Sequence, residues 1–96
     1  MIYLPENWEF ISPTIDMDEP YTVYKVVQEK EENSYTENLL TFAILDDPYI
    51  SSHLCVVKLA QKDEKFHIST TFLATNNVTR AHYKLQTLLE EMVVTK

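Results

Sequence analysis

The chain of 96 residues contains no glycine. At average usage, about seven would be expected in a chain of this length. Glycine is the residue that most readily adopts positive φ and lets a backbone approach a ligand closely. Dinucleotide-binding fingerprints, P-loops and nucleophile elbows depend on it. The sequence therefore excludes these large enzyme classes.

The length and composition limit the class of protein. A chain of 96 residues with 45% hydrophobic residues suits one globular domain, spanning 1–96, with a modest core. No apolar run approaches the roughly 18 residues of a membrane helix, and residues 1–10 lack the basic start of a signal peptide. The single cysteine, Cys55, has no partner for an internal disulfide and fits a reducing compartment. We therefore predict a cytoplasmic protein that does not contact membranes.

The acidic charge is concentrated in the first half of the chain. Residues 1–48 carry eleven acidic and two basic residues, a net charge of −9, whereas residues 49–96 carry four acidic and six basic residues, a net charge of +2. Direct binding of nucleic acid is not expected, because phosphates require clustered Lys and Arg. An acidic surface instead favours encounter with a basic protein.

The hydrophobic pattern predicts an α+β fold, with an antiparallel sheet of about four strands and a C-terminal helix packed on one face. Residues 1–20 are expected to be irregular, apart from a helical turn at 5–10. Residues 21–74 predict a β-meander with strands at 21–28, 38–45, 53–61 and 66–74. Asn76 and Asn77 supply a helix N-cap. Apolar residues then recur at helical spacing through 79–94, with Leu85, Leu88 and Met92 in the core.

The third and fourth predicted strands can be paired by register. If Gln61 faces Phe66 across a loop at 62–65, then Cys55, Phe66 and Phe72 share the more apolar face. We expect the helix to cover this face. The strand at 38–45 is apolar on both sides, which predicts a second cover. That cover is the N-terminal segment with Tyr3, Trp8 and Phe10, a second copy of the chain, or a partner.

Few residues suggest catalysis or metal binding. Cys55 is predicted to be a buried hydrophobe, with His67 on the opposite face, so a Cys–His pair is not expected. The histidines His53, His67 and His82 lack the short spacing of zinc ligands. Asp46 and Asp47 precede Pro48 and are typical of a turn. We predict no catalytic residue, no metal and no cofactor.

The candidate binding residues combine acids with tyrosines, which are enriched at protein-binding hot spots. The predicted partner-binding residues are Asp16, Asp18, Glu19, Glu29, Glu31, Glu32, Tyr21 and Tyr24. In size, acidity and lack of catalytic motifs, the chain resembles, as a class, small phage or mobile-element inhibitors and bacterial immunity proteins, although no motif carries this likeness.

These observations favour a non-enzymatic protein-binding module that inhibits or neutralises a more basic protein, such as a nucleic-acid-binding enzyme or a toxin. One alternative is a homodimeric scaffold or chaperone-like adaptor that uses an exposed sheet face. Another is a small enzyme that uses Cys55, or Asp46 with Asp47.

Overall fold

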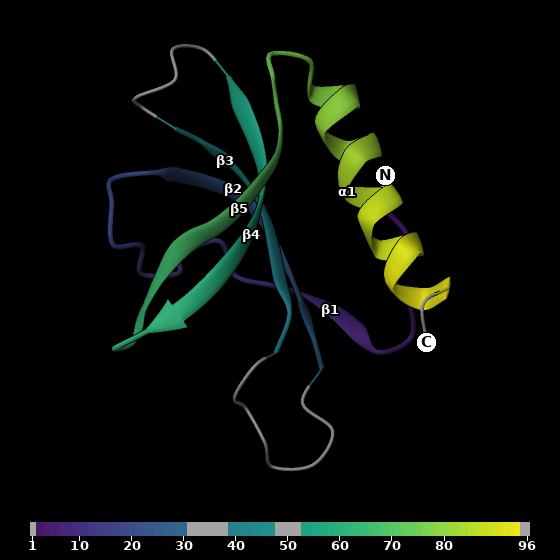
Figure 1. Cartoon of the computed structure of the whole chain (residues 1–96), viewed down its shortest axis with the longest axis horizontal. Helices are drawn as coiled ribbons and strands as arrows, with labels where there is room; N and C mark the ends of the chain where they lie inside the picture. Colours follow the sequence, from purple (N-terminus) through teal and green to yellow (C-terminus); the bar gives the residue numbers. More distant parts are fainter. Residues whose placement is uncertain (1, 31–38, 48–52, 95–96) are drawn as a thin grey trace.

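A computed structural model describes residues 2–30, 39–47 and 53–94, the last three of these as helix backbone only. Five antiparallel strands form one sheet in the order β1-β2-β3-β4-β5, and a single C-terminal helix packs on one face (Figure 1). The strands are β1 (Trp8–Ile11), β2 (Thr22–Glu29), β3 (Thr41–Asp46), β4 (Leu54–Lys62) and β5 (Lys65–Thr75), and the helix is α1 (Val78–Val94). The predicted α+β class is therefore confirmed, with one strand more than expected.

The additional strand, β1, lies within the segment predicted to be irregular. The turn at its start is closed by a hydrogen bond from Trp8 N to Pro5 O, 3.0 Å, and no helical turn extends over residues 5–10. Trp8 is buried, whereas Glu9 and Phe10 are exposed, so only the first residue of this edge strand is fully buried. Trp8 stacks on Phe42 with ring centroids 5.4 Å apart, and Phe72 meets Phe42 edge-on at 5.9 Å.

The helix covers the face of the sheet opposite to the predicted one. Its buried residues Ala81, Leu85, Leu88 and Leu89 pack against a cluster that we call the helix-side core. On the sheet and the N-terminal segment this cluster contains Ile2, Trp8, Val27, Phe42, Ile44 and Val56. The face that carries Cys55 and Phe66 lies on the other side. The prediction that α1 covers it is wrong, although Leu85 and Leu88 are core residues as expected; the side chain of Met92 lies outside the described residues.

The error arises from two irregularities in β5. The predicted pairing of Gln61 with Phe66 is correct, but the register then shifts twice, so that Cys55 faces Ala74 rather than Phe72. Ser69 and Phe72 are the extra residues that have no partner in β4. Each bulge turns the following side chains to the other face. Phe72 consequently packs in the helix-side core.

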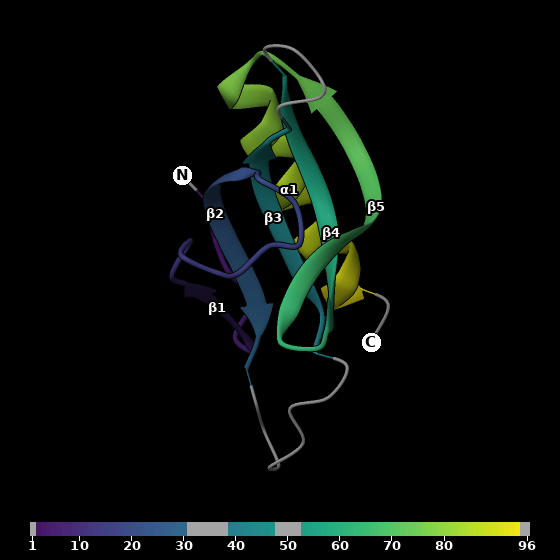
Figure 2. The same ribbon diagram turned by 90° about the vertical axis from the view of Figure 1, so that its left-hand side faces the viewer.

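The second face is covered by residues 12–20, which we call the crossing segment. It leaves β1, crosses the sheet to β5 and returns to β2 (Figure 2). Ile15 and Met17 from this segment, with Ile11 and Tyr21 beside it, pack on a cluster that we call the segment-side core. This cluster contains Val26, Ala43, Leu45, Cys55, Val57 and Leu59. The N-terminal segment is thus the second cover, but not through the predicted residues.

The predicted covering residues occupy other positions. Trp8 belongs to the helix-side core, while Tyr3 and Phe10 are exposed. The backbone of Tyr3 exchanges two hydrogen bonds with the Gln86 side chain, at 2.7 and 2.9 Å, which holds the N-terminus against α1. The start of α1 is capped as predicted, since Asn77 Oδ1 accepts a hydrogen bond from Arg80 N at 3.1 Å.

Candidate functional site

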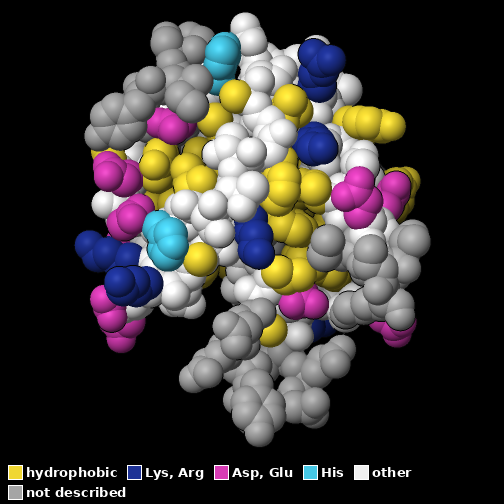
Figure 3. Space-filling model, viewed as in Figure 1, with side chains coloured by type: hydrophobic (Ala, Val, Ile, Leu, Met, Phe, Trp, Pro, Cys, Tyr) yellow, Lys and Arg dark blue, Asp and Glu magenta, His cyan; other side chains and the backbone are white. Residues whose placement is uncertain are grey.

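The crossing segment presents three exposed carboxylates from an anchored backbone. Phe66 N donates to Asp16 O at 2.8 Å, and Asp18 N donates to Phe66 O at 2.9 Å. Met17, between the two acids, points into the segment-side core. The side chains of Asp16, Asp18 and Glu19 remain exposed. Figure 3 shows Asp and Glu side chains along the left-hand edge of the molecule, which is the side that faces the viewer in Figure 2.

The two predicted tyrosines differ in exposure. Tyr21 follows the crossing segment and is half-buried against the segment-side core. Tyr24 is 53% exposed. It lies at the register shift between Val23 and Lys25, where β2 has one residue more than β3. Bulges of this kind redirect side chains at functional surfaces. Tyr24 is therefore available to a partner, whereas Tyr21 also stabilises the fold.

The remaining predicted acids do not join this surface. Glu29 ends β2, at the opposite end of that strand from the crossing segment, and its Oε1 accepts a hydrogen bond from Leu40 N at 3.0 Å. Glu29 N also donates to Leu40 O at 3.0 Å. This carboxylate closes the strand pair and is part of the fold. Glu31 and Glu32 lie outside the described residues.

Cys55 lies in the segment-side core and is 1% exposed. Its register partners are Leu45 and Ala74. Burial, followed by the negative charges of Asp47 and Asp46, raises the pKa of the Cys55 thiol above its ordinary value of 9.0. A thiolate is the reactive species, so this environment opposes nucleophilic chemistry. Among the residues that the structure describes, no group of three or more His, Cys, Asp or Glu side chains could hold a metal ion.

A cleft opens between the β2–β3 and β4–β5 hairpins, and the sequence did not predict it. The β3–β4 pairing runs only from Asp46 to Thr41, which faces Leu59. Beyond Leu59, β4 continues with β5 alone to Lys62, while Leu40 stays bonded to Glu29 of β2. The two hairpins therefore separate. The space between them has a volume of about 560 Å³.

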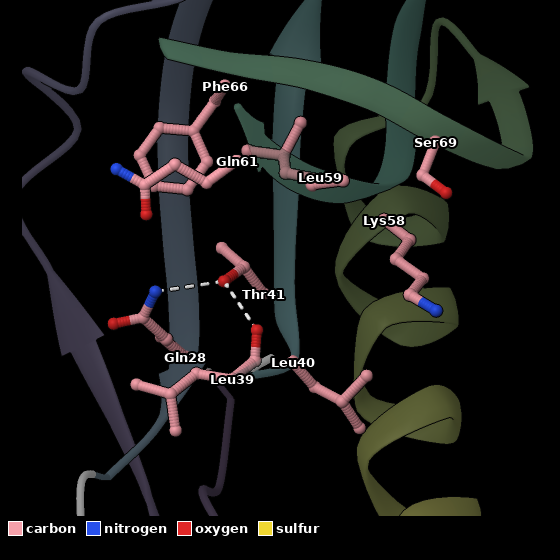
Figure 4. A pocket seen from close by; sticks show the side chains of 10 residues that line it. Gln28, Leu39, Leu40, Thr41, Lys58, Leu59, Gln61, Phe66 and Ser69 are labelled. Atoms are coloured by element: carbon pink, nitrogen blue, oxygen red, sulfur yellow. Dashed lines mark hydrogen bonds between the residues drawn. The ribbon is translucent and has the colours of Figure 1, made fainter. Parts of the chain in front are cut away.

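The cleft has a polar floor, apolar walls and polar ends (Figure 4). On its floor, Thr41 Oγ1 accepts a hydrogen bond from Gln28 Nε2 at 2.9 Å and donates one to Leu39 O at 3.4 Å. Figure 4 shows Lys58 and Ser69 at one end, and Gln28 and Gln61 toward the other. The lining residues are Gln28, Leu39, Leu40, Thr41, Lys58, Leu59, Ala60, Gln61, Phe66 and Ser69.

Comparison with known proteins adds no relative, since no family model matches the chain and neither a curated protein nor a solved structure matches it significantly. No helix in the described ranges has the length and hydropathy that crossing a bilayer requires.

Proposed function

We propose that this protein is a non-enzymatic protein-binding module that neutralises a more basic protein in the cytoplasm, and that the crossing segment forms its binding surface. The observation that carries the proposal is the placement of Asp16, Asp18 and Glu19. All three are exposed on a segment whose backbone is hydrogen-bonded to Phe66 and whose apolar side chains are packed on the sheet.

Anchoring matters because ordering a loop on binding reduces affinity. Ile15 and Met17 are already packed on the segment-side core in the free protein. The crossing segment therefore needs little further ordering when a partner binds. The backbone that carries the carboxylates is therefore preorganised. Tyr24 adds an exposed aromatic side chain on the adjoining strand. Exposed tyrosines and acids are residue types that suit the recognition of a basic protein.

The charge of the whole chain supports the same class of partner. A net charge of −7 produces a field that attracts basic proteins and repels nucleic acid. A nuclease toxin or another nucleic-acid-binding enzyme has the complementary surface. The buried Cys55 and its raised pKa favour binding over thiol catalysis.

The homodimeric alternative depended on an uncovered sheet face. Over the described residues, α1 covers one face and the crossing segment covers the other. The alternative therefore loses the feature that suggested it.

The test uses two variants that each neutralise three exposed acids. D16N/D18N/E19Q removes the charge of the crossing segment, and the matched control E6Q/E9Q/E90Q removes the same charge elsewhere. Basic proteins captured from a host lysate by the wild type and by the control should be absent with the first variant. The association rate of a captured protein is then measured across salt concentrations.

We expect the wild-type association rate to fall steeply with salt, because the Debye length shrinks from about 30 Å at 0.01 M to about 8 Å at 0.15 M. The variant D16N/D18N/E19Q should associate more slowly and show a weaker salt dependence, with an unchanged melting temperature. Equal rates for the two variants, or a flat salt dependence of the wild type, would contradict the proposal.

A further inference from the structure

We propose that the cleft between the two hairpins is a second binding site, which takes a small amphipathic anion: an apolar body that ends in a carboxylate or a related oxyanion. This site lies at the β4–β5 hairpin and uses none of the carboxylates of the crossing segment. It is therefore separate from the proposed protein-binding surface.

The size of the cleft suits a small molecule. Ligand pockets usually have volumes of roughly 300–1,000 Å³. A volume of about 560 Å³ lies within this range. Leu39 and Leu40 line one wall, and Leu59 and Phe66 line the other. The half-buried side chains Leu39, Leu40 and Phe66 provide apolar surface on both sides of a bound molecule, whereas Leu59 is buried.

The charge of the cleft selects the ligand's head group. Lys58 is the one charged residue among the described lining residues, and none of them is acidic. Lys58 is half-buried, and among the described residues its amine has no hydrogen bond or ion pair. A half-buried cation without a counterion favours an anionic ligand group. The nearby hairpin tip does not offset this charge, since Lys62 and Lys65 balance Asp63 and Glu64.

Ser69 places a second polar group beside Lys58. It is the extra residue of the first bulge in β5, with no register partner in β4. Lys58 pairs with Thr70, the next residue, and Figure 4 shows Ser69 at the same end of the cleft as Lys58. An oxyanion at this end could accept hydrogen bonds from both groups. The carboxamides of Gln28 and Gln61, toward the other end, would contact the rest of the ligand.

Two related probes test the proposal. Anilinonaphthalene sulfonate carries an anionic head group on an apolar body, and N-phenyl-1-naphthylamine has a similar body without the charge. Lys58→Met removes the charge and keeps an apolar side chain of similar length, while Lys62→Met is the matched control on the exposed hairpin tip. Ala60→Phe fills the cleft. Binding is followed by fluorescence and by amide chemical-shift mapping.

We expect the sulfonate to bind the wild type and Lys62→Met equally, and Lys58→Met about tenfold more weakly, which is the usual effect of losing one charge-assisted hydrogen bond. The uncharged probe should bind all three proteins alike. Ala60→Phe should weaken both probes. Shifts should be confined to the lining residues, with Gln28, Leu40 and Ser69 as reporters.

Three results would overturn the inference. The first is equal affinity of the sulfonate for the wild type and Lys58→Met. The second is chemical-shift changes centred on α1 or the crossing segment. The third is no binding of the sulfonate at about 1 mM, a concentration at which even weak specific sites are occupied. None of these results bears on the carboxylates of the crossing segment, so the proposed function stands or fails separately.

Discussion

Met17 and Phe66 form an isolated parallel bridge, which joins the crossing segment to the edge of β5. The bridge uses both backbone groups of Phe66, while the side chains of the two residues pack in the segment-side core. This contact therefore holds the crossing segment over one face of the sheet and occupies part of the β5 edge. It also fixes the backbone of the acids on either side of Met17. An exposed edge would otherwise be open to pairing with another chain.

Met17→Ala should destabilise the fold by about 2 kcal/mol, at the lower end of the range for truncating a buried methionine, because Met17 is only half-buried. The amides of Asp18 and Phe66 should also exchange with solvent faster. Urea unfolding and hydrogen exchange measure both effects. Asp18→Ala is the control, and it should change stability by less than about 0.5 kcal/mol because its side chain is exposed. Unchanged exchange in Met17→Ala would show that packing of the Met17 side chain does not hold the segment.

The tip of the β4–β5 hairpin shows the effect of having no glycine. Asp63 and Glu64 have φ values of 53° and 70°, and Lys62 pairs with Lys65 across them. Two central residues with positive φ match a type I′ turn, in which glycine is normally favoured. The predicted four-residue loop is thus a two-residue turn. A left-handed conformation costs a residue with a Cβ roughly 1–2 kcal/mol.

Glu64→Gly should therefore stabilise the protein by about 1 kcal/mol. Glu64→Ala is the matched control, because it removes the same carboxylate but keeps the Cβ and its steric cost. It should lie within about 0.5 kcal/mol of the wild type. Urea denaturation of the three proteins provides the measurement. A Glu64→Gly protein no more stable than Glu64→Ala would mean that this turn stores no such strain.

Local patterns in the sequence were sufficient to predict four strands, the helix and the pairing of Gln61 with Phe66. They failed where the pattern was interrupted. The bulges at Ser69 and Phe72 carry no glycine, which is a common marker of an irregular strand. Without that signal, the alternation along β5 assigned Phe72 to the wrong face of the sheet. The helix was therefore also predicted to cover the wrong face. Strand β1 was missed because four residues are too few to establish a period, and because its burial does not alternate: Glu9 and Phe10 are both exposed.

The candidate sites could also be predicted only in part from the sequence. Exposed acids can be read from the sequence, and Asp16, Asp18 and Glu19 are exposed as a charged segment should be. Their anchoring depends on the contact with Phe66, which lies about fifty residues away along the chain and has no local signal. The cleft depends on how far β3 pairs with β4, so its lining residues come together only in the folded sheet.

Leu88→Ala should cost about 2–5 kcal/mol of folding stability, because Leu88 is 5% exposed in the helix-side core and its truncation leaves a cavity. Tyr83→Ala on the same helix is the control. Tyr83 is 74% exposed, so its loss should change stability by less than about 0.5 kcal/mol. Chemical denaturation separates the two variants. Equal stability of the two variants would show that Leu88 does not pack in the core of the protein.

Cys55 should react slowly with thiol reagents at pH 8 in the native state, because it is buried and its pKa is raised. Since the unfolded chain loses the thiol proton at a lower pH than the folded protein, the contribution of Cys55 to stability is complete below about pH 9 and falls as the pH rises through the folded pKa. Cys55→Ala lacks this titration. The free energy of unfolding of the wild type should therefore fall more steeply than that of Cys55→Ala above pH 9. Parallel profiles would show that folding does not raise the pKa of Cys55. Fast labelling of the native protein would place Cys55 in an accessible site and reopen the case for thiol chemistry.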